Sequence, residues 1–221
     1  MAVSAPQLYK VLVEDGSSFH GGRGRWAPGR WRSVRGELIP CQRGLHVVTV
    51  AQLPAWLGPA IWRVEVRGEL IDAGDKMVAR RARITERVAA WDERTARLFA
   101  ADCAERVLPV FERERPGDNR PREAIAVARR YANGAATRED LAAARVAAGD
   151  AEGAAWAAWA AWTAGAWAAR AARVAARVAG AAESARAARV AARVAATGDA
   201  GAAWQGRHLA EMLGLPWDVE S

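Results

Sequence analysis

The spacing of apolar positions changes partway along the chain. Up to about residue 85, apolar residues form short runs that are separated by turns rich in Gly, Pro and Asp. The run IWRVEV at Ile61–Val66 alternates strictly, and Trp62, Val64 and Val66 make up its apolar face. Such alternation is typical of a half-buried strand. We therefore expect the first part of the chain to form a small β-rich domain.

Other short apolar runs predict the remaining strands of this domain. The segment Gly16–Gly36, which is rich in Gly and Arg, predicts a long loop, and Pro54–Gly58 fits one helical turn. The expected strands are Leu8–Val13, Glu37–Ile39, Leu45–Val50 and one or two strands within Gly68–Ile84.

Near Thr85 the apolar period becomes that of a helix. Apolar residues then recur at helical spacing as far as Arg115, and Pro109 is expected to kink or end this helix. Pro121 lies in the first turn of the next helix, and Gly134 is expected to end it. The second part of the chain is therefore expected to be helical.

A third helix and an uncharged fourth helix are expected next. Thr137–Asp140 has the pattern of a capping box, Gly149 closes the helix that it begins, and Asp150 caps the following one. The stretch Gly153–Ala169 has no charge and no polar face, so we expect it to be the buried central helix of a bundle. Four tryptophans fall within one helical sector of about 140°: Trp156, Trp159, Trp162 and Trp167.

An exact repeat follows, since ARAARVAARVA occupies Ala169–Ala179 and again Ala185–Ala195. Each copy carries three arginines on one narrow stripe, and the two stripes are Arg170, Arg173 and Arg177, and Arg186, Arg189 and Arg193. Like charges one helical turn apart cost about 0.2–0.5 kcal/mol per pair in an isolated helix, so we expect the arginines to have a partner.

After the repeat, Thr197–Asp199 introduces a last helix that ends at Gly214.

Two kinds of partner fit the arginine stripes. The interpretation that we prefer is internal pairing with acidic residues of the first helix, and the alternative is an external polyanion such as nucleic acid. The acidic candidates are Asp102, Glu105, Glu112 and Glu114.

Charge and composition limit the setting of the protein. The net charge of +7 comes from an excess of arginine, which permits attraction to nucleic acid or to acidic partners and is also what a GC-rich genome produces. Two cysteines imply no disulfide framework and favour a reducing cytoplasm. The N-terminus has no signal-peptide pattern. The tryptophans lie along the middle of the uncharged stretch rather than at its ends, so we expect no membrane association.

The segment Cys41–His46 is the most motif-like piece of the first half. Together with His20 and Cys103 it contains metal-ligand residue types, but the paired spacing of a metal site is missing, so we expect neither a metal nor a cofactor. The interpretation that we prefer is a tight turn with Gly44 at positive φ and a buried Cys41 thiol. The alternative is a thiolate–imidazole pair of Cys41 and His46 in an enzyme, with His20 nearby.

Both halves of the chain resemble known families. The part Trp91–Leu215, most specifically Asp102–Pro109 and Asn119–Arg122, resembles an immunity-protein family of small Ala/Arg-rich helical proteins found beside bacterial toxin systems and in actinobacteria and their phages. This resemblance implies a binding role. The N-terminal part, at Tyr9-Lys10 and Cys41-x-x-Gly44-x-His46, resembles an uncharacterised domain that is frequent in phage genomes.

These observations predict an α+β protein with a β-rich domain at residues 1–84 and an Ala/Trp-rich helical bundle at residues 85–221. We expect a non-enzymatic cytoplasmic protein of toxin-neutralising or phage-accessory type that binds a protein partner. A nucleic-acid-associated protein that uses the arginine stripes is one alternative. An enzyme with its site around His20, Cys41 and His46 is the other.

Overall fold

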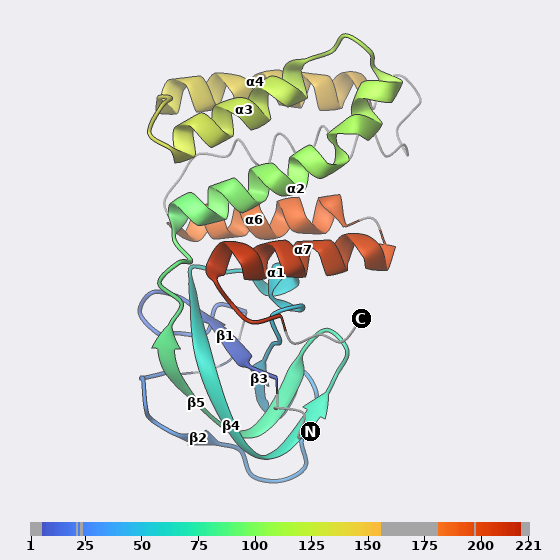
Figure 1. The fold of residues 1–221 in the computed structure, drawn as a ribbon. Coiled ribbons are helices and arrows are strands. Elements are labelled where there is room, and N and C mark those ends of the chain that lie inside the picture. The colour runs from blue at the N-terminus through green and yellow to red at the C-terminus, as the bar shows by residue number, and fades with distance from the viewer. Residues whose placement is uncertain (1–5, 21, 23, 156–180, 197, 218–221) are drawn as a thin grey trace. The chain divides into compact units, whose positions relative to one another are not determined.

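The computed structural model describes residues 6–20, 22, 24–155, 181–196 and 198–217. The chain divides into two compact units, residues 1–91 together with 206–221, and residues 92–205. The first unit holds an antiparallel sheet and the second is helical, which confirms the α+β class (Figure 1). The expected boundary at residue 84 falls inside a strand, because the last strand continues to Arg87.

The strands of the first unit pair in the order β1-β4-β5-β2, and β3 also pairs with β5. Tyr9 of β1 exchanges two backbone hydrogen bonds with Val48, of 2.8 and 2.9 Å. The chain around β3 therefore adjoins β1 as well as β5, and the sheet curls back on itself. The strands are β1 Leu8–Leu12, β2 Arg32–Ser33, β3 Leu45–Val47, β4 Ala60–Asp72 and β5 Met77–Arg87.

The alternating run Ile61–Val66 lies in β4 as predicted, and its apolar face packs into the core of the sheet. The helical turn expected near Pro54 is α1, Leu53–Trp56. Glu37–Ile39 is not a strand, because the backbone of Ile39 bonds to Arg43 across a tight turn rather than to another strand. The short strand β2 lies within the segment that was expected to be a loop.

The helices are α2 Glu93–Glu114, α3 Arg120–Ala132, α4 Arg138–Ala155, α6 Ala181–Ala195 and α7 Gly198–Leu213, and the division between the units falls within α7. Several predicted ends are confirmed. Pro121 lies in the first turn of α3, and Gly134 follows its end with a φ of 72°. Thr137 and Asp140 form the reciprocal capping box before α4, with each side chain accepting from the other residue's backbone N–H.

Two predicted helix ends do not occur. Pro109 was expected to kink or end its helix, and of these two outcomes the end does not occur: α2 continues through Pro109 to Glu114, since buried side chains such as Leu108 and Phe111 hold both sides of the proline in the core. α4 continues through Gly149 and Asp150 rather than ending there, because Ala148 and Ala151 are both buried on the continuing helix. Asp150 is therefore an interior helical residue, not a cap.

The predicted central helix falls largely outside the described residues. Only its first residues, Gly153–Ala155, are described, at the end of α4. Trp156, Trp159, Trp162 and Trp167, and the first arginine stripe of Arg170, Arg173 and Arg177, lie outside the described residues.

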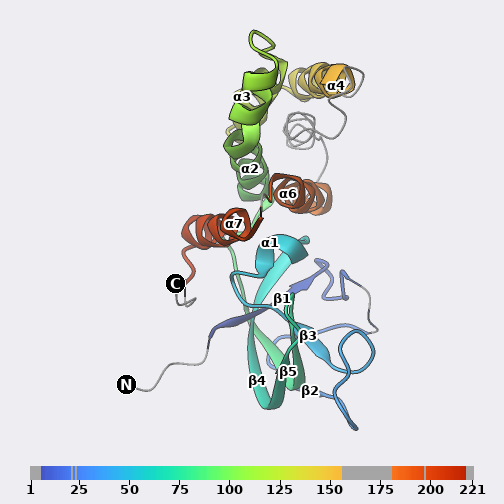
Figure 2. The ribbon, with the colours of Figure 1, turned by 90° about the vertical axis from the view of Figure 1, so that its right-hand side faces the viewer.

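Within the second unit, α2 lies beside α6 and α3 lies beside α4 (Figures 1 and 2). α6 buries alanines at helical spacing, and α2 contributes its own buried alanines together with Phe99. Small side chains allow two helices to approach closely, so the contact depends on there being no larger group at these positions. The buried alanines of α6 include Ala185, Ala188, Ala192 and Ala195.

This packing predicts a large penalty for a longer side chain in α6. Ala188→Leu places extra carbons at a fully buried position and should destabilise the protein by about 1–3 kcal/mol. Arg193→Leu, at an exposed position of the same helix, is the matched control and should change stability by about 0.5 kcal/mol or less. Thermal unfolding monitored by circular dichroism measures both, and equal melting temperatures for the two variants would contradict the alanine-dependent packing.

Candidate functional site

The first unit contains a cavity of about 180 Å³ beside the curled edge of the sheet. The three candidate residues His20, Cys41 and His46, far apart in the sequence, all line it. They come from the loop after β1, the tight turn before β3, and β3 itself. The sheet brings them together because the chain around β3 adjoins both β1 and β5.

Two residues that sequence reasoning did not select also line the cavity. Lys10 of β1 and Lys76 in the turn just before β5 are the only lysines among the 32 lysine and arginine residues of the chain. The rarity of lysine was the signal that could have identified them. Arg and Lys are not interchangeable, since Lys carries a compact ammonium whose pKa responds strongly to burial.

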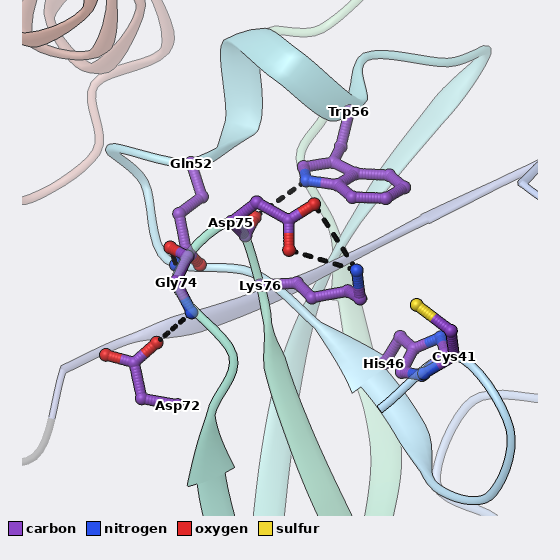
Figure 3. A network of polar contacts seen from close by, with 8 residues as sticks. All are labelled: Cys41, His46, Gln52, Trp56, Asp72, Gly74, Asp75 and Lys76. Atoms are coloured by element: carbon purple, nitrogen blue, oxygen red, sulfur yellow. Dashed lines mark hydrogen bonds and ion pairs between the residues drawn. The ribbon is translucent and has the colours of Figure 1, made fainter. Parts of the chain in front are cut away.

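Lys76 is held by the turn between β4 and β5 (Figure 3). Its Nζ lies 3.0 Å from Oδ1 of Asp75 and 5.0 Å from the centre of the Trp56 ring, and the residue is 7% exposed. Trp56 Nε1 donates to the backbone oxygen of Asp75 at 2.7 Å, and Gln52 Nε2 donates to that of Gly74 at 2.8 Å. α1 therefore fixes the turn, and the turn directs Lys76 toward Cys41 and His46. Hydrogen bonding to Asp75, with a contribution from Cys41, raises the pKa of Lys76.

Lys10 has a different environment. Its Nζ donates to the backbone oxygen of His46 at 2.7 Å and lies 5.3 Å from the centre of the Trp26 ring. The guanidinium of Arg32 lies 4.9 Å from the centre of the same ring. Burial, with a further contribution from Arg32, lowers the pKa of Lys10 to about 8. Within the described part of the chain, no carboxylate forms an ion pair with Lys10.

Cys41 adopts a strained backbone conformation. Its φ is 65°, the only positive value among the described residues other than glycine. Gln42 N donates to the backbone oxygen of Ile39 at 3.0 Å, so Cys41 occupies the third position of a type II turn, where Gly is preferred. Such strain often occurs at functional sites.

The turn is tight as expected, but the thiol of Cys41 is exposed rather than buried. The backbone N–H of Cys41 donates to Nε2 of His46 at 3.2 Å, so this nitrogen faces the main chain and not the thiol. The described residues therefore show no thiolate–imidazole pair of Cys41 and His46. Burial, with Lys10 and Lys76 as neighbouring cations, lowers the pKa of His46, which favours its neutral form.

The other candidate groups are placed as follows. A ring nitrogen of His20 lies 2.6 Å from the backbone oxygen of Trp56, and its ring packs edge-on against Phe19 and Trp56. Cys103 is buried in α2 of the second unit, and burial raises its pKa. Among the residues that the structure describes, no three His, Cys, Asp or Glu side chains lie close enough together to hold a metal ion.

In the helical unit, three of the acids expected to pair with the arginine stripes form ion pairs with arginines of α3. Arg129 lies 2.6 Å from both Asp102 and Glu105, and Arg122 lies 2.7 Å from Glu112. α3 lies directly beside α2, which brings its arginines within reach of these acids. The first arginine stripe lies outside the described residues, so the internal pairing that we preferred stays a prediction.

The second arginine stripe is placed on α6. Arg186 and Arg193 are exposed, and Arg189 is partly buried. Burial, together with the nearby Arg193 and Arg186, lowers the pKa of Arg189. α6 therefore presents clustered positive charge along the side opposite its buried alanines.

The comparisons with known proteins bear on the helical half. A family model described as Imm-5 like putative immunity protein matches residues 87–210. No curated protein and no solved structure matches the chain. Within the described ranges, no helix has the length and apolar character needed to cross a membrane.

The strained turn predicts an unusual response at Cys41. A left-handed conformation costs a non-Gly residue about 1–2 kcal/mol of folding free energy, and replacing Cys41 with Gly removes this cost. Glycine has more conformational freedom in the unfolded chain, which offsets about 0.5–1 kcal/mol of the gain. Cys41→Gly should therefore leave the protein equally stable or up to about 1 kcal/mol more stable. Cys41→Val, with a branched side chain at the same φ, should be destabilised. Thermal unfolding of the two variants checks this, and a Cys41→Gly variant less stable than Cys41→Val would show that the turn is not strained.

The acid–arginine contacts between α2 and α3 predict a pH-dependent contribution to stability. Hydrogen bonding to Arg129 lowers the pKa of Glu105, so the stabilisation is present above the unfolded pKa, near 4.5, and is lost as the pH falls through the folded pKa. Arg129→Met should cost about 1 kcal/mol at pH 7, where both groups are partly exposed to solvent, and less at pH 3. Arg113→Met, at an exposed position of α2, is the control. Urea unfolding at the two pH values measures the difference, and a cost independent of pH would rule out the ionic contribution.

Proposed function

Because the chain belongs to the Imm-5 like putative immunity protein family, we propose that its helical unit binds a toxin protein and neutralises it. The observation that carries this proposal is the extent of the match, since residues 87–210 include the whole of the helical unit, residues 92–205. The match does not include the cavity of the β-rich unit, so the binding function is assigned to the helices.

The residue types of the helical unit support binding rather than catalysis. Residues 92–205 contain no histidine, the side chain used most often for proton transfer near neutral pH. Cys103, the one cysteine of the unit, is buried, and its raised pKa keeps it as a neutral thiol. Neutralisation by binding needs neither group.

The charge of α6 supports an acidic partner. Arg186 and Arg193 are exposed, and within the described residues neither forms an ion pair. Arginine is enriched in protein interfaces because its planar group binds carboxylates in a bidentate manner and also stacks on aromatic rings. Complementary charge raises association rates and excludes partners of the same sign. We infer that the toxin presents acidic side chains to this face of α6.

The proposed setting is the cytoplasm. Cys41 and Cys103 are both free thiols, which suits a reducing compartment. A cytoplasmic toxin would meet the protein before it reaches its target, and the positive net charge of the chain would favour that encounter.

Co-expression with bacterial protein toxins, each produced from an inducible gene, tests the proposal. The protein should restore growth of cells that produce the toxin, and the purified pair should bind in calorimetry. The double variant Arg186→Glu/Arg193→Glu should weaken binding at least tenfold and abolish protection, because it replaces two favourable charges with repulsive ones.

A matched control distinguishes an effect of the α6 face on binding from an effect of the net charge of the protein. Arg130→Glu/Arg145→Glu makes the same change of charge at exposed positions of α3 and α4 and should keep binding and protection. Failure of the unaltered protein to protect would contradict neutralisation. Equal loss in both double variants would contradict the assignment to α6. A salt-sensitive complex with duplex DNA that only the α6 variant loses would instead favour the nucleic-acid alternative.

A further inference from the structure

We propose that the cavity of the β-rich unit, which Lys10 and Lys76 both line, binds the phosphate group of a small ligand. This site goes beyond the toxin-binding function and does not rest on it, because every residue involved lies outside the family match at residues 87–210. The proposal rests on the placement of the lysines, the charge balance around them, and the shape of the cavity.

The first argument is placement. Both lysines of the chain line this one cavity, although they are far apart in the sequence. Lys10 comes from β1 and Lys76 from the turn just before β5, and the backbone oxygen of His46 in β3 fixes the ammonium of Lys10. In a chain whose other basic residues are all arginines, two lysines at one place indicate that a compact ammonium is needed there.

The second argument is charge balance. The described residues place two ammonium groups and the guanidinium of Arg32 around this region, while the lowered pKa of His46 favours its neutral form. Asp75 is the carboxylate that pairs with Lys76, and no described carboxylate pairs with Lys10. A desolvated cation without an anion is costly, so an entering anion would recover part of that cost. The lowered pKa of Lys10 is consistent with this environment.

The third argument is the class of anion. A phosphate carries up to two negative charges and several acceptor oxygens, which match two separate ammonium groups better than one carboxylate does. The cavity of about 180 Å³ shares Lys10, Cys41 and His46 with an adjoining cavity of about 560 Å³ that Arg32 lines, so there is room for a phosphate and for a small organic group attached to it. Lys76 and the ring of Trp56 lie on the same wall of the cavity, so a phosphate at Lys76 leaves the ring beside the ligand (Figure 3). The bound group is thus a free phosphate or the phosphate of a small organic molecule.

Calorimetry on the full chain tests the site with three probes: inorganic phosphate, phenyl phosphate and acetate. We expect saturable binding of both phosphates at one site and at least tenfold weaker binding of acetate. Tighter binding of phenyl phosphate than of inorganic phosphate would identify an organic ligand that contacts Trp56. Equal affinities would identify free phosphate as the ligand.

Proton uptake gives a second readout. At pH 8 about half of the Lys10 amines are unprotonated, and a bound phosphate favours the protonated form. Binding at pH 8 should therefore take up as much as about half a proton, measured by repeating the titration in buffers of different ionisation enthalpy. Affinity should fall between pH 7 and pH 9 because Lys10 loses its charge over that range. The other charged or titratable groups around the two lysines are Asp75, Cys41, His46, His20 and Arg32.

The variants keep the test specific. Lys10→Met and Lys76→Met should each weaken phosphate binding at least tenfold. Arg35→Met, which removes one exposed positive charge from the same unit, should leave binding unchanged. Lys10→Arg keeps the charge and should abolish the proton uptake.

Several outcomes would overturn the proposal. The proposal fails if phosphate shows no saturable binding at millimolar concentrations, or if acetate binds as tightly as phosphate. It also fails if Lys10→Met and Arg35→Met weaken phosphate binding equally. If Lys10→Met fails to fold, Lys76→Met and the proton uptake of the unaltered protein still decide the question. None of these results alters the growth-protection test of the helical unit, so the two proposals fail separately.

Discussion

The β-rich unit depends on the position of β1. This strand pairs with β4 along its whole length and, through Tyr9, exchanges two backbone bonds with Val48. That double pairing curls the sheet and places β3 between β1 and β5. The next residue, Lys10, is held by the backbone oxygen of His46. The cavity therefore exists because β1 closes the sheet, and its lysines follow from that closure.

The helical unit uses a different principle. Its α2–α6 contact is built largely from alanines, so close approach and the exclusion of larger groups take the place of large apolar side chains. The charged residues of this unit have two roles. The acids of α2 bind Arg122 and Arg129 of α3, and the arginines of α6 lie on the side opposite the buried alanines. The same residue type thus joins two helices in one place and gives the proposed binding face in another.

The predictability of the fold varied with the kind of signal. Strict alternation at Ile61–Val66 and the capping chemistry of Thr137 and Asp140 are local, and both were predicted correctly. The continuation of α4 through Gly149 was missed because buried contacts outweigh the local preference of glycine to end a helix. β2 was missed because two residues that pair with distant Arg81 and Ala82 carry no periodic pattern.

The candidate site was predictable in part. A motif search selected His20, Cys41 and His46, and all three line one cavity. Lys10 and Lys76 were not selected, although their rarity in the sequence was a signal, because neither lies in a motif and only the pairing of β3 with β5 and of Val48 with Tyr9 brings them to the same cavity. The pairing of Asp102 and Glu105 with Arg129 could not be predicted from the sequence either, because all the arginines have the same chemistry and only the fold places α3 beside α2.

The central claim about the β-rich unit is that its cavity holds a desolvated ammonium for which an anion is the missing partner. Titration of lysines labelled with ¹³C at Cε, followed by NMR, tests this directly because the chain has only two lysines. We expect the Lys10 signal to titrate with a pKa of about 8 and this pKa to rise when phosphate is added, while Lys76 stays protonated throughout that range. The account would be contradicted if both lysines titrated near the ordinary pKa of about 10.4 and neither pKa changed when phosphate was added.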